Sequence, residues 1–301
     1  MKKIFMLISV LLMVSLVACS NSNQSKETKD NQIKDEPKEQ ISNSNEDSNI
    51  AENTENNKGA DQEASNQEEA NNDKEMGGAV EAAYRIADNW SITPIKEGIN
   101  EKVVLLTIDD APDKYALEMA RTLKDLDAGA IFFVNGHFLE TPENKEILKK
   151  IHDMGFIIGN HTYSHKKLPD LTKEEQKNEI IRVNDMVEEI IGERPKFFRA
   201  PNGANTDYSK NLVKEEKMVL MNWSYGYDYF KPYMDKEKLT KAMITGEGPE
   251  AREPNSLLNP GANLLMHDRK WTSEALGDIV VGLREQGYEM VDPHLIETIS
   301  D

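Results

Sequence analysis

The sequence predicts an α/β fold in which a mostly parallel sheet alternates with helices and curls toward a barrel. Short aliphatic runs rich in β-branched residues, such as 103–108, have the composition of strands that are buried on both faces. Segments with helical periodicity, such as 172–191, separate these runs. At least six strands follow this pattern, which fits a barrel better than a small open sheet.

The expected strands are short and continuously apolar, and they lie at 103–108, 129–134, 156–159, 197–199, 219–223 and 263–266. Helical periodicity places the intervening helices at 116–126, 142–154, 172–191, 207–216, 235–245 and 273–286. The second helix has clear boundary signals, since Pro142 stands at its start and Gly155 just past its end.

The first 18 residues have the pattern of a secretory signal peptide. Two lysines precede an apolar run at 4–17, which is shorter than the roughly 20 residues that a spanning helix needs. Cys19, the only cysteine, directly follows Ala18, the small residue that ends the apolar segment. Residues 16–19 resemble a bacterial lipobox, which implies cleavage before Cys19 and lipidation of Cys19; the alternative is a free thiol inside the signal. We expect an extracytoplasmic protein, lipid-anchored to the bacterial cell membrane.

Residues 19–76 have the composition of a disordered acidic tether, and residues 77–301 are expected to form one domain. The tether is rich in Asn, Glu, Ser and Gln, lacks aromatic residues, and carries about half of the formal net charge of −18. A flexible chain of this length spans about 40 Å, enough to lift a domain into the cell wall. The domain is acidic too, so nucleic acid is not an expected partner.

Charged side chains follow the expected strands at their carboxyl ends. These ends lie on one side of a parallel α/β fold, so residues that are far apart in sequence are expected to converge there. The residues are Asp109, Asp110, His161, His165, Arg199, Asp228 and His267.

Two imidazoles and one carboxylate form a common ligand set for a divalent metal, and three protein ligands leave one position for water. A second carboxylate beside the first can act as a base. Neighbouring strand residues point to opposite faces, so Asp109 and Asp110 can divide these tasks only where the strand breaks. Pro112 is consistent with such a break. Taken alone, an Asp-Asp pair can be a simple turn, and the spacing of His161 and His165 can be incidental.

Residues 101–293 resemble the NodB-homology polysaccharide deacetylases, carbohydrate esterase family 4. Five motifs match in order: Thr107-Ile108-Asp109-Asp110-Ala111-Pro112, His161-Thr162-Tyr163-Ser164-His165, Arg199-Ala200-Pro201-Asn202-Gly203, Trp223 with Asp228-Tyr229, and Leu265-Met266-His267. The resemblance implies a distorted (β/α) barrel of the NodB-homology type. It also implies a metal-dependent hydrolase that removes N-acetyl groups from the sugars of a surface polysaccharide.

The resemblance further implies a role for each matching residue. Asp110, His161 and His165 would hold a divalent metal, with Zn²⁺ expected, and Asp109 would be the general base. Arg199 would orient Asp109, His267 would donate a proton, and Asp228 would orient His267. The backbone N–H of Asn202 would stabilise the oxyanion, and Leu265 and Trp223 would line a pocket for the acetyl group. Ordinary core packing is the alternative for Leu265 and Trp223.

Two departures from the family pattern keep other functions open. Ala111 replaces a usual Gly, which can shift the loop beside the metal, and Tyr229 replaces a Trp, which weakens the assignment of Asp228. The expected substrate is a GlcNAc- or MurNAc-containing polymer, with peptidoglycan preferred because of the tether. The alternatives are a non-catalytic glycan-binding lipoprotein of the same fold and an O-acetyl esterase.

Overall fold

The computed structural model describes residues 81–299. The predicted signal peptide (1–18), Cys19 and the tether (19–76) lie outside the described residues. Within 81–299, none of the helices combines the length and the apolar character needed to span a bilayer.

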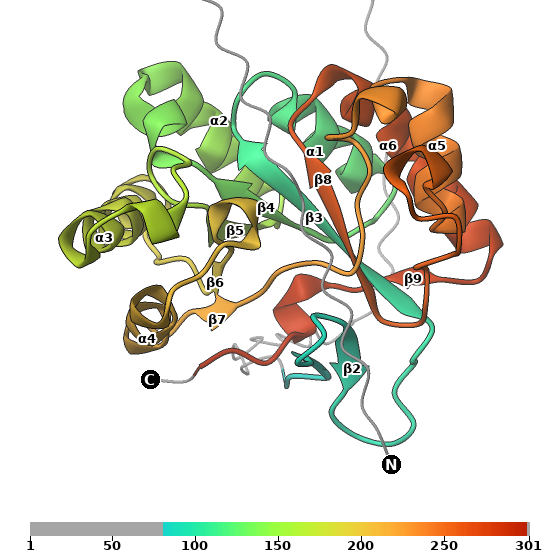
Figure 1. The fold of residues 1–301 in the computed structure, drawn as a ribbon, viewed down its shortest axis with the longest axis horizontal. Coiled ribbons are helices and arrows are strands. Elements are labelled where there is room, and N and C mark those ends of the chain that lie inside the picture. The colour runs from blue at the N-terminus through green and yellow to red at the C-terminus, as the bar shows by residue number, and fades with distance from the viewer. Residues whose placement is uncertain (1–80, 300–301) are drawn as a thin grey trace, which may run out of the picture. The chain divides into compact units, whose positions relative to one another are not determined.

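A seven-stranded parallel sheet forms the centre of the described domain (Figure 1). Its order is β7-β6-β5-β4-β3-β8, and β9 pairs with the start of β3. The strands are β3 (Val103–Ala111), β4 (Ala130–Val134), β5 (Ile157–Asn160), β6 (Phe197–Phe198), β7 (Val219–Leu220), β8 (Ala262–His267) and β9 (Glu289–Met290). All six strands expected from the sequence are present, and β9 was not predicted.

Irregular backbone joins the two edges of the sheet. The chain after β7 runs beside β8, where Tyr225 forms a parallel bridge with Leu264. Leu265 donates its backbone N–H to the carbonyl of Tyr225 at 2.8 Å, and Ser224 donates to the carbonyl of Asn263 at 2.8 Å. The sheet therefore curls into a distorted (β/α) barrel, as the sequence predicted.

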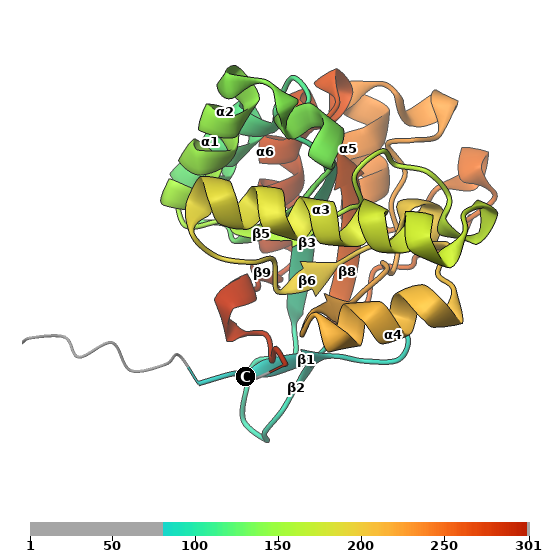
Figure 2. The ribbon, with the colours of Figure 1, turned by 90° about the vertical axis from the view of Figure 1, so that its left-hand side faces the viewer.

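Six helices cover the outside of the sheet (Figures 1 and 2). They are α1 (Ala116–Asp125), α2 (Pro142–Asp153), α3 (Lys173–Ile191), α4 (Asp207–Glu215), α5 (Lys236–Thr245) and α6 (Lys270–Glu285). Single 3-10 turns lie at Gly136–Glu140, Leu168–Asp170, Pro201–Gly203, Lys231–Tyr233, Pro249–Ala251 and Pro293–Leu295. Thr172 begins α3 with a capping box that includes Glu175. α6 begins three residues earlier than predicted, directly after the short loop that follows His267.

The two faces of β3 pack in different apolar clusters. Val104, Leu106 and Ile108 contact the helices, whereas Val103 and Leu105 belong to a second cluster inside the barrel. This interior cluster also contains residues of a two-stranded antiparallel hairpin, β1 (Tyr84–Ile86) and β2 (Ile92–Pro94), which the sequence did not predict. The hairpin lies at the end of the sheet where β3 begins (Figures 1 and 2), so the carboxyl ends of the strands remain open.

Candidate active site

The carboxyl end of β3 directs two neighbouring carboxylates to different tasks. The register of β3 against β4 shifts between Ile108 and Ala111, and Asp110 adopts a left-handed φ of 61°. This is the break that the Asp109–Asp110 pair requires. Ala111 itself lies within β3 with its φ outside the left-handed region, so alanine fits this position without the freedom of glycine.

Asp110, His161 and His165 converge above the end of β3, with one ligand atom from each within 4.8 Å of the others. Oδ1 of Asp110 lies 3.4 Å from Nε2 of His165 and 3.8 Å from Nε2 of His161. Burial raises the pKa of Asp110, but attraction by the surrounding basic side chains, which include His267 and Arg269, outweighs burial and lowers it. The carboxylate is therefore ionised, as a metal ligand must be.

His161 has the protonation state that a metal ligand needs. Its Nδ1 lies 2.8 Å from the carbonyl oxygen of Arg199, which can only accept a hydrogen bond, so Nδ1 carries the proton. Burial lowers the pKa of His161 despite the attraction of Asp109 and Asp110, which keeps the ring neutral. Among residues 81–299, Nε2 has no hydrogen-bond partner although it is buried. A divalent cation would satisfy this lone pair, so the donor set fits a metal site that leaves a position for water.

Arg199 holds the second carboxylate, Asp109. The Arg199 side chain is fully buried, and its Nη1 donates to Oδ1 of Asp109 at 2.7 Å and to Oγ1 of Thr107 at 2.8 Å. Its Nη2 donates to the carbonyl of Asn222 at 2.8 Å, which fixes the fork of the guanidinium. Oδ2 of Asp109 instead faces the metal group, 3.5 Å from Nε2 of His161. One oxygen of Asp109 is thus bound and the other is directed to the site.

His267, at the end of β8, lies beside Asp109, because the two residues are direct partners in the β3–β8 ladder. Its Nδ1 lies 2.8 Å from Oδ1 of Asp228, and Oδ2 of Asp228 accepts the hydroxyl of Thr272 at 2.8 Å. Burial lowers the pKa of His267, but the contact with Asp228 outweighs burial and raises the pKa to about 9. Tyr229 does not disturb this pair, since its ring packs edge-on against His267 with 5.7 Å between centroids.

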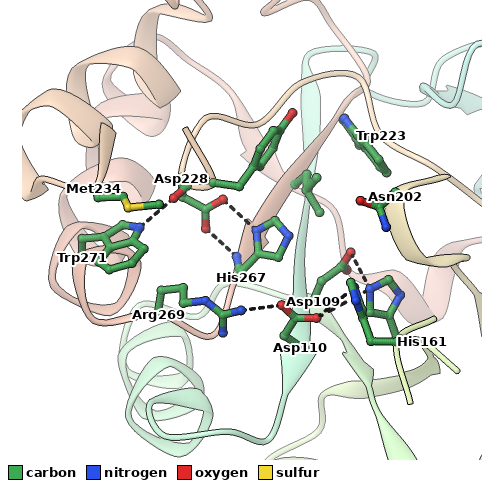
Figure 3. A pocket seen from close by; sticks show the side chains of 13 residues that line it. Asp109, Asp110, His161, Asn202, Trp223, Asp228, Met234, His267, Arg269 and Trp271 are labelled. Carbon is green, nitrogen blue, oxygen red and sulfur yellow. Dashed lines mark hydrogen bonds and ion pairs between the residues drawn. The ribbon is translucent and has the colours of Figure 1, made fainter. Parts of the chain in front are cut away.

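A pocket of about 520 Å³ opens above these groups (Figure 3). Leu265 and Trp223 line it, and Asn202, also among the lining residues, has a left-handed φ of 56°. Tyr229 and Met234 are both 44% exposed and extend the wall outward. The pocket therefore combines charged groups with apolar lining residues, as small-molecule sites commonly do.

The sequence analysis gave no role to three residues after His267. Nη2 of Arg269 donates to Oδ2 of Asp110 at 2.6 Å. The buried carboxylate of Asp268 accepts the backbone N–H groups of Asp113 and Tyr115 at 2.7 and 2.6 Å, which fixes the loop after β3. Trp271 lines the pocket and donates Nε1–H to the carbonyl of Asp228 at 2.8 Å. These three residues come directly after a strand that ends in a site residue. That position in the sequence could have indicated that they belong to the site.

The curled parallel sheet, with one carboxylate and two imidazoles at its carboxyl end, places the protein among the α/β-barrel hydrolases built around a divalent cation. The family model described as polysaccharide deacetylase matches residues 96–221. The chain belongs to this family, whose members use a divalent metal.

Relatives of known activity and a solved structure agree with this family. A peptidoglycan-N-acetylglucosamine deacetylase of Bacillus cereus is 30% identical over 206 residues, which cover 65% of this chain and 71% of the relative. The peptidoglycan-N-acetylmuramic acid deacetylase PdaA of Bacillus subtilis is 29% identical over 191 residues, covering 62% and 68%. The crystal structure of a carbohydrate esterase family 4 pseudoenzyme from Bacillus anthracis is 29% identical with a TM-score of 0.55, covering 63% of each chain.

Proposed function

We propose that the protein hydrolyses the N-acetyl groups of GlcNAc or MurNAc residues in peptidoglycan. The names of the two relatives support this substrate. The observation that carries the activity is the convergence of Asp110, His161 and His165 beside the Arg199-bound carboxylate of Asp109. His267 completes the arrangement on the neighbouring strand.

Asp110, His161 and His165 would hold the divalent metal. When bound, such an ion would supply Lewis-acid chemistry and would lower the pKa of water from about 15.7 toward about 7. The neutral Nε2 of His161 and the ionised Oδ1 of Asp110 are in the state that binding requires.

Asp109 would take the proton of the attacking water at Oδ2, the oxygen that faces the site. Its other oxygen is held by Arg199, so the carboxylate cannot rotate away without breaking a bond at 2.7 Å. Water adds its oxygen to the acetamide carbonyl carbon. The backbone N–H of Asn202, at the edge of the pocket, would donate to the oxyanion that forms.

His267 would donate the proton from Nε2 to the sugar nitrogen as the carbon–nitrogen bond breaks. Its Nδ1 is bound to Asp228, so Nε2 is the position left for this transfer. The products are acetate and the free amine of the sugar. Leu265 and Trp223 would surround the acetyl methyl group, since both line the pocket beside these groups.

Acetate release from purified peptidoglycan and from chito-oligosaccharides, with and without a chelator, tests the proposal. We expect chelator-sensitive release that Asp109→Asn abolishes. A neighbour of the same fold is a pseudoenzyme, so glycan binding without turnover, unaffected by Asp109→Asn, would instead identify a binding protein. Faster release from O-acetylated than from N-acetylated substrates would identify an esterase.

We also propose that the mature protein is extracytoplasmic and anchored to the bacterial membrane through lipidated Cys19. The support is the basic, apolar and lipobox pattern of residues 1–19, together with the acidic tether that follows. Labelling with a fatty-acid analogue and membrane fractionation test this. Cys19→Ser should abolish the label and release the protein from the membrane, and a labelled Cys19→Ser variant would contradict the proposal.

A further inference from the structure

The metal ligand Asp110 uses its two carboxylate oxygens differently. Oδ1 faces the imidazoles of His161 and His165, at 3.8 and 3.4 Å. Oδ2 accepts a hydrogen bond from Nη2 of Arg269 at 2.6 Å (Figure 3). Arg269 thus occupies the oxygen that points away from the imidazoles and leaves the other one free.

The structure holds Arg269 in this position. Its Nη1 donates to the carbonyl oxygen of Asp268 at 2.8 Å, and its backbone N–H bonds to the carbonyl of His267 at 2.8 Å. Arg269 is also the residue before α6, and Asp268 is tied to the loop after β3 through the backbone of Asp113 and Tyr115. The guanidinium therefore has a fixed place from which to contact Asp110.

Asp110 needs such a partner because it lies at an irregular point of β3. Its φ of 61° places it outside the regular strand, at the shift in register against β4. Its side chain is only 12% exposed, so solvent gives it little support. Partners that orient metal ligands are worth about 10–100-fold in affinity in known metal sites.

We propose that Arg269 is a positioning residue for the metal site, which binds Oδ2 of Asp110 and directs Oδ1 to the cation. This inference rests on the proposed metal site. Asp113 also lies near the guanidinium, with Oδ2 3.8 Å from Nη1, but it faces a different nitrogen from the one that binds Asp110.

The test is the affinity of the purified protein for Zn²⁺ alone, measured by competition with a chromophoric chelator. Arg269→Met keeps much of the unbranched apolar stem of the side chain but removes every donor, and it should weaken binding about tenfold or more. Arg269→Lys restores a donor and should recover most of the affinity. The control Asp113→Asn should bind Zn²⁺ as tightly as the wild type.

A different role for Arg269 predicts the opposite change in Zn²⁺ affinity. If Arg269 were only a positive charge near the cation, its removal would relieve repulsion, and Arg269→Met would bind Zn²⁺ equally or more tightly. That outcome would overturn the proposal, and so would an equal loss in the Met and Lys variants. The visible spectrum of the Co²⁺-loaded proteins should change in Arg269→Met and not in Asp113→Asn.

Two further measurements separate the role of Arg269 from a general effect on folding and from the proposed activity. The metal-free Arg269→Met protein should keep the circular dichroism spectrum of the wild type and unfold in one cooperative transition, so that its loss of affinity reflects the missing bond to Asp110 and not a misfolded site. A wild-type protein that binds Zn²⁺ but releases no acetate would refute the proposed activity and leave the role of Arg269 standing. A wild-type protein that binds no Zn²⁺ would refute both.

Discussion

The carboxylate of Asp228 contacts both the ring and the backbone of His267. Oδ1 lies 2.8 Å from Nδ1 of the ring, and Oδ2 accepts the backbone N–H of His267 at 2.6 Å. Burial favours the neutral ring, but the ion pair with Asp228 is stronger and raises the pKa of His267 to about 9. The ring is therefore protonated in neutral solution, as a general acid must be.

The pH dependence of kcat/KM should reveal this pair. Activity should fall as the pH rises through about 9, where His267 loses the proton that it donates. Asp228→Asn keeps the shape of the side chain but removes its charge, which is the largest influence that opposes burial of the His267 ring. The alkaline limb of the profile should then move to lower pH by about one unit or more. An alkaline limb that does not move would show that another group titrates there.

Asp110→Ala should abolish both metal binding and turnover. Loss of a residue that only supports a ligand costs about 10–100-fold in affinity, so loss of a ligand should cost more than about 100-fold. Metal analysis and acetate release measure the two effects on the same sample. His294→Gln is the matched control, because this exposed histidine bonds to Asp292 away from the site. Equal metal content in the Asp110→Ala variant and the wild type would contradict the assignment of the ligands.

Arg199→Met should destabilise the fold as well as abolish activity. It leaves the buried carboxylate of Asp109 without its partner, and such unpaired buried charges cost about 3–5 kcal/mol. The free energy of unfolding in urea measures the loss. The double variant Arg199→Met/Asp109→Asn should recover part of it, since the unpaired charge is gone. A double variant that is less stable than Arg199→Met would rule out the unpaired charge as the cause.

Leu265→Ala should widen the acetyl pocket. Leu265 lies on the pocket wall and is 2% exposed, so its truncation opens space beside the proposed acetyl site. The ratio of activity on N-propionyl to N-acetyl oligosaccharides should therefore rise. Met234→Ala is the control, because its 44% exposed side chain lies farther out on the rim. An equal rise in both variants would remove Leu265 from the acetyl pocket.

Much of the barrel could be predicted because its signals are local. Continuous aliphatic runs such as Val103–Ile108 predict buried strands from composition alone, and Thr172 marks the start of α3 by its cap. The hairpin of β1 and β2 could not be predicted in this way. Its three-residue strands carry a weak pattern, and they are stabilised by Tyr84 and Ile92 packing against distant parts of the barrel.

The sequence by itself determined the order of the strands and helices, the types of residue at the strand ends and the motifs that match the family. Only the tertiary structure decided which atoms meet. Oδ1 of Asp110 faces His161 and His165, whereas Oδ2 binds Arg269, 159 residues away in the chain. The physical reason is that local patterns depend on neighbours in sequence, whereas the aim of a side chain depends on backbone breaks and on partners that folding brings from other strands.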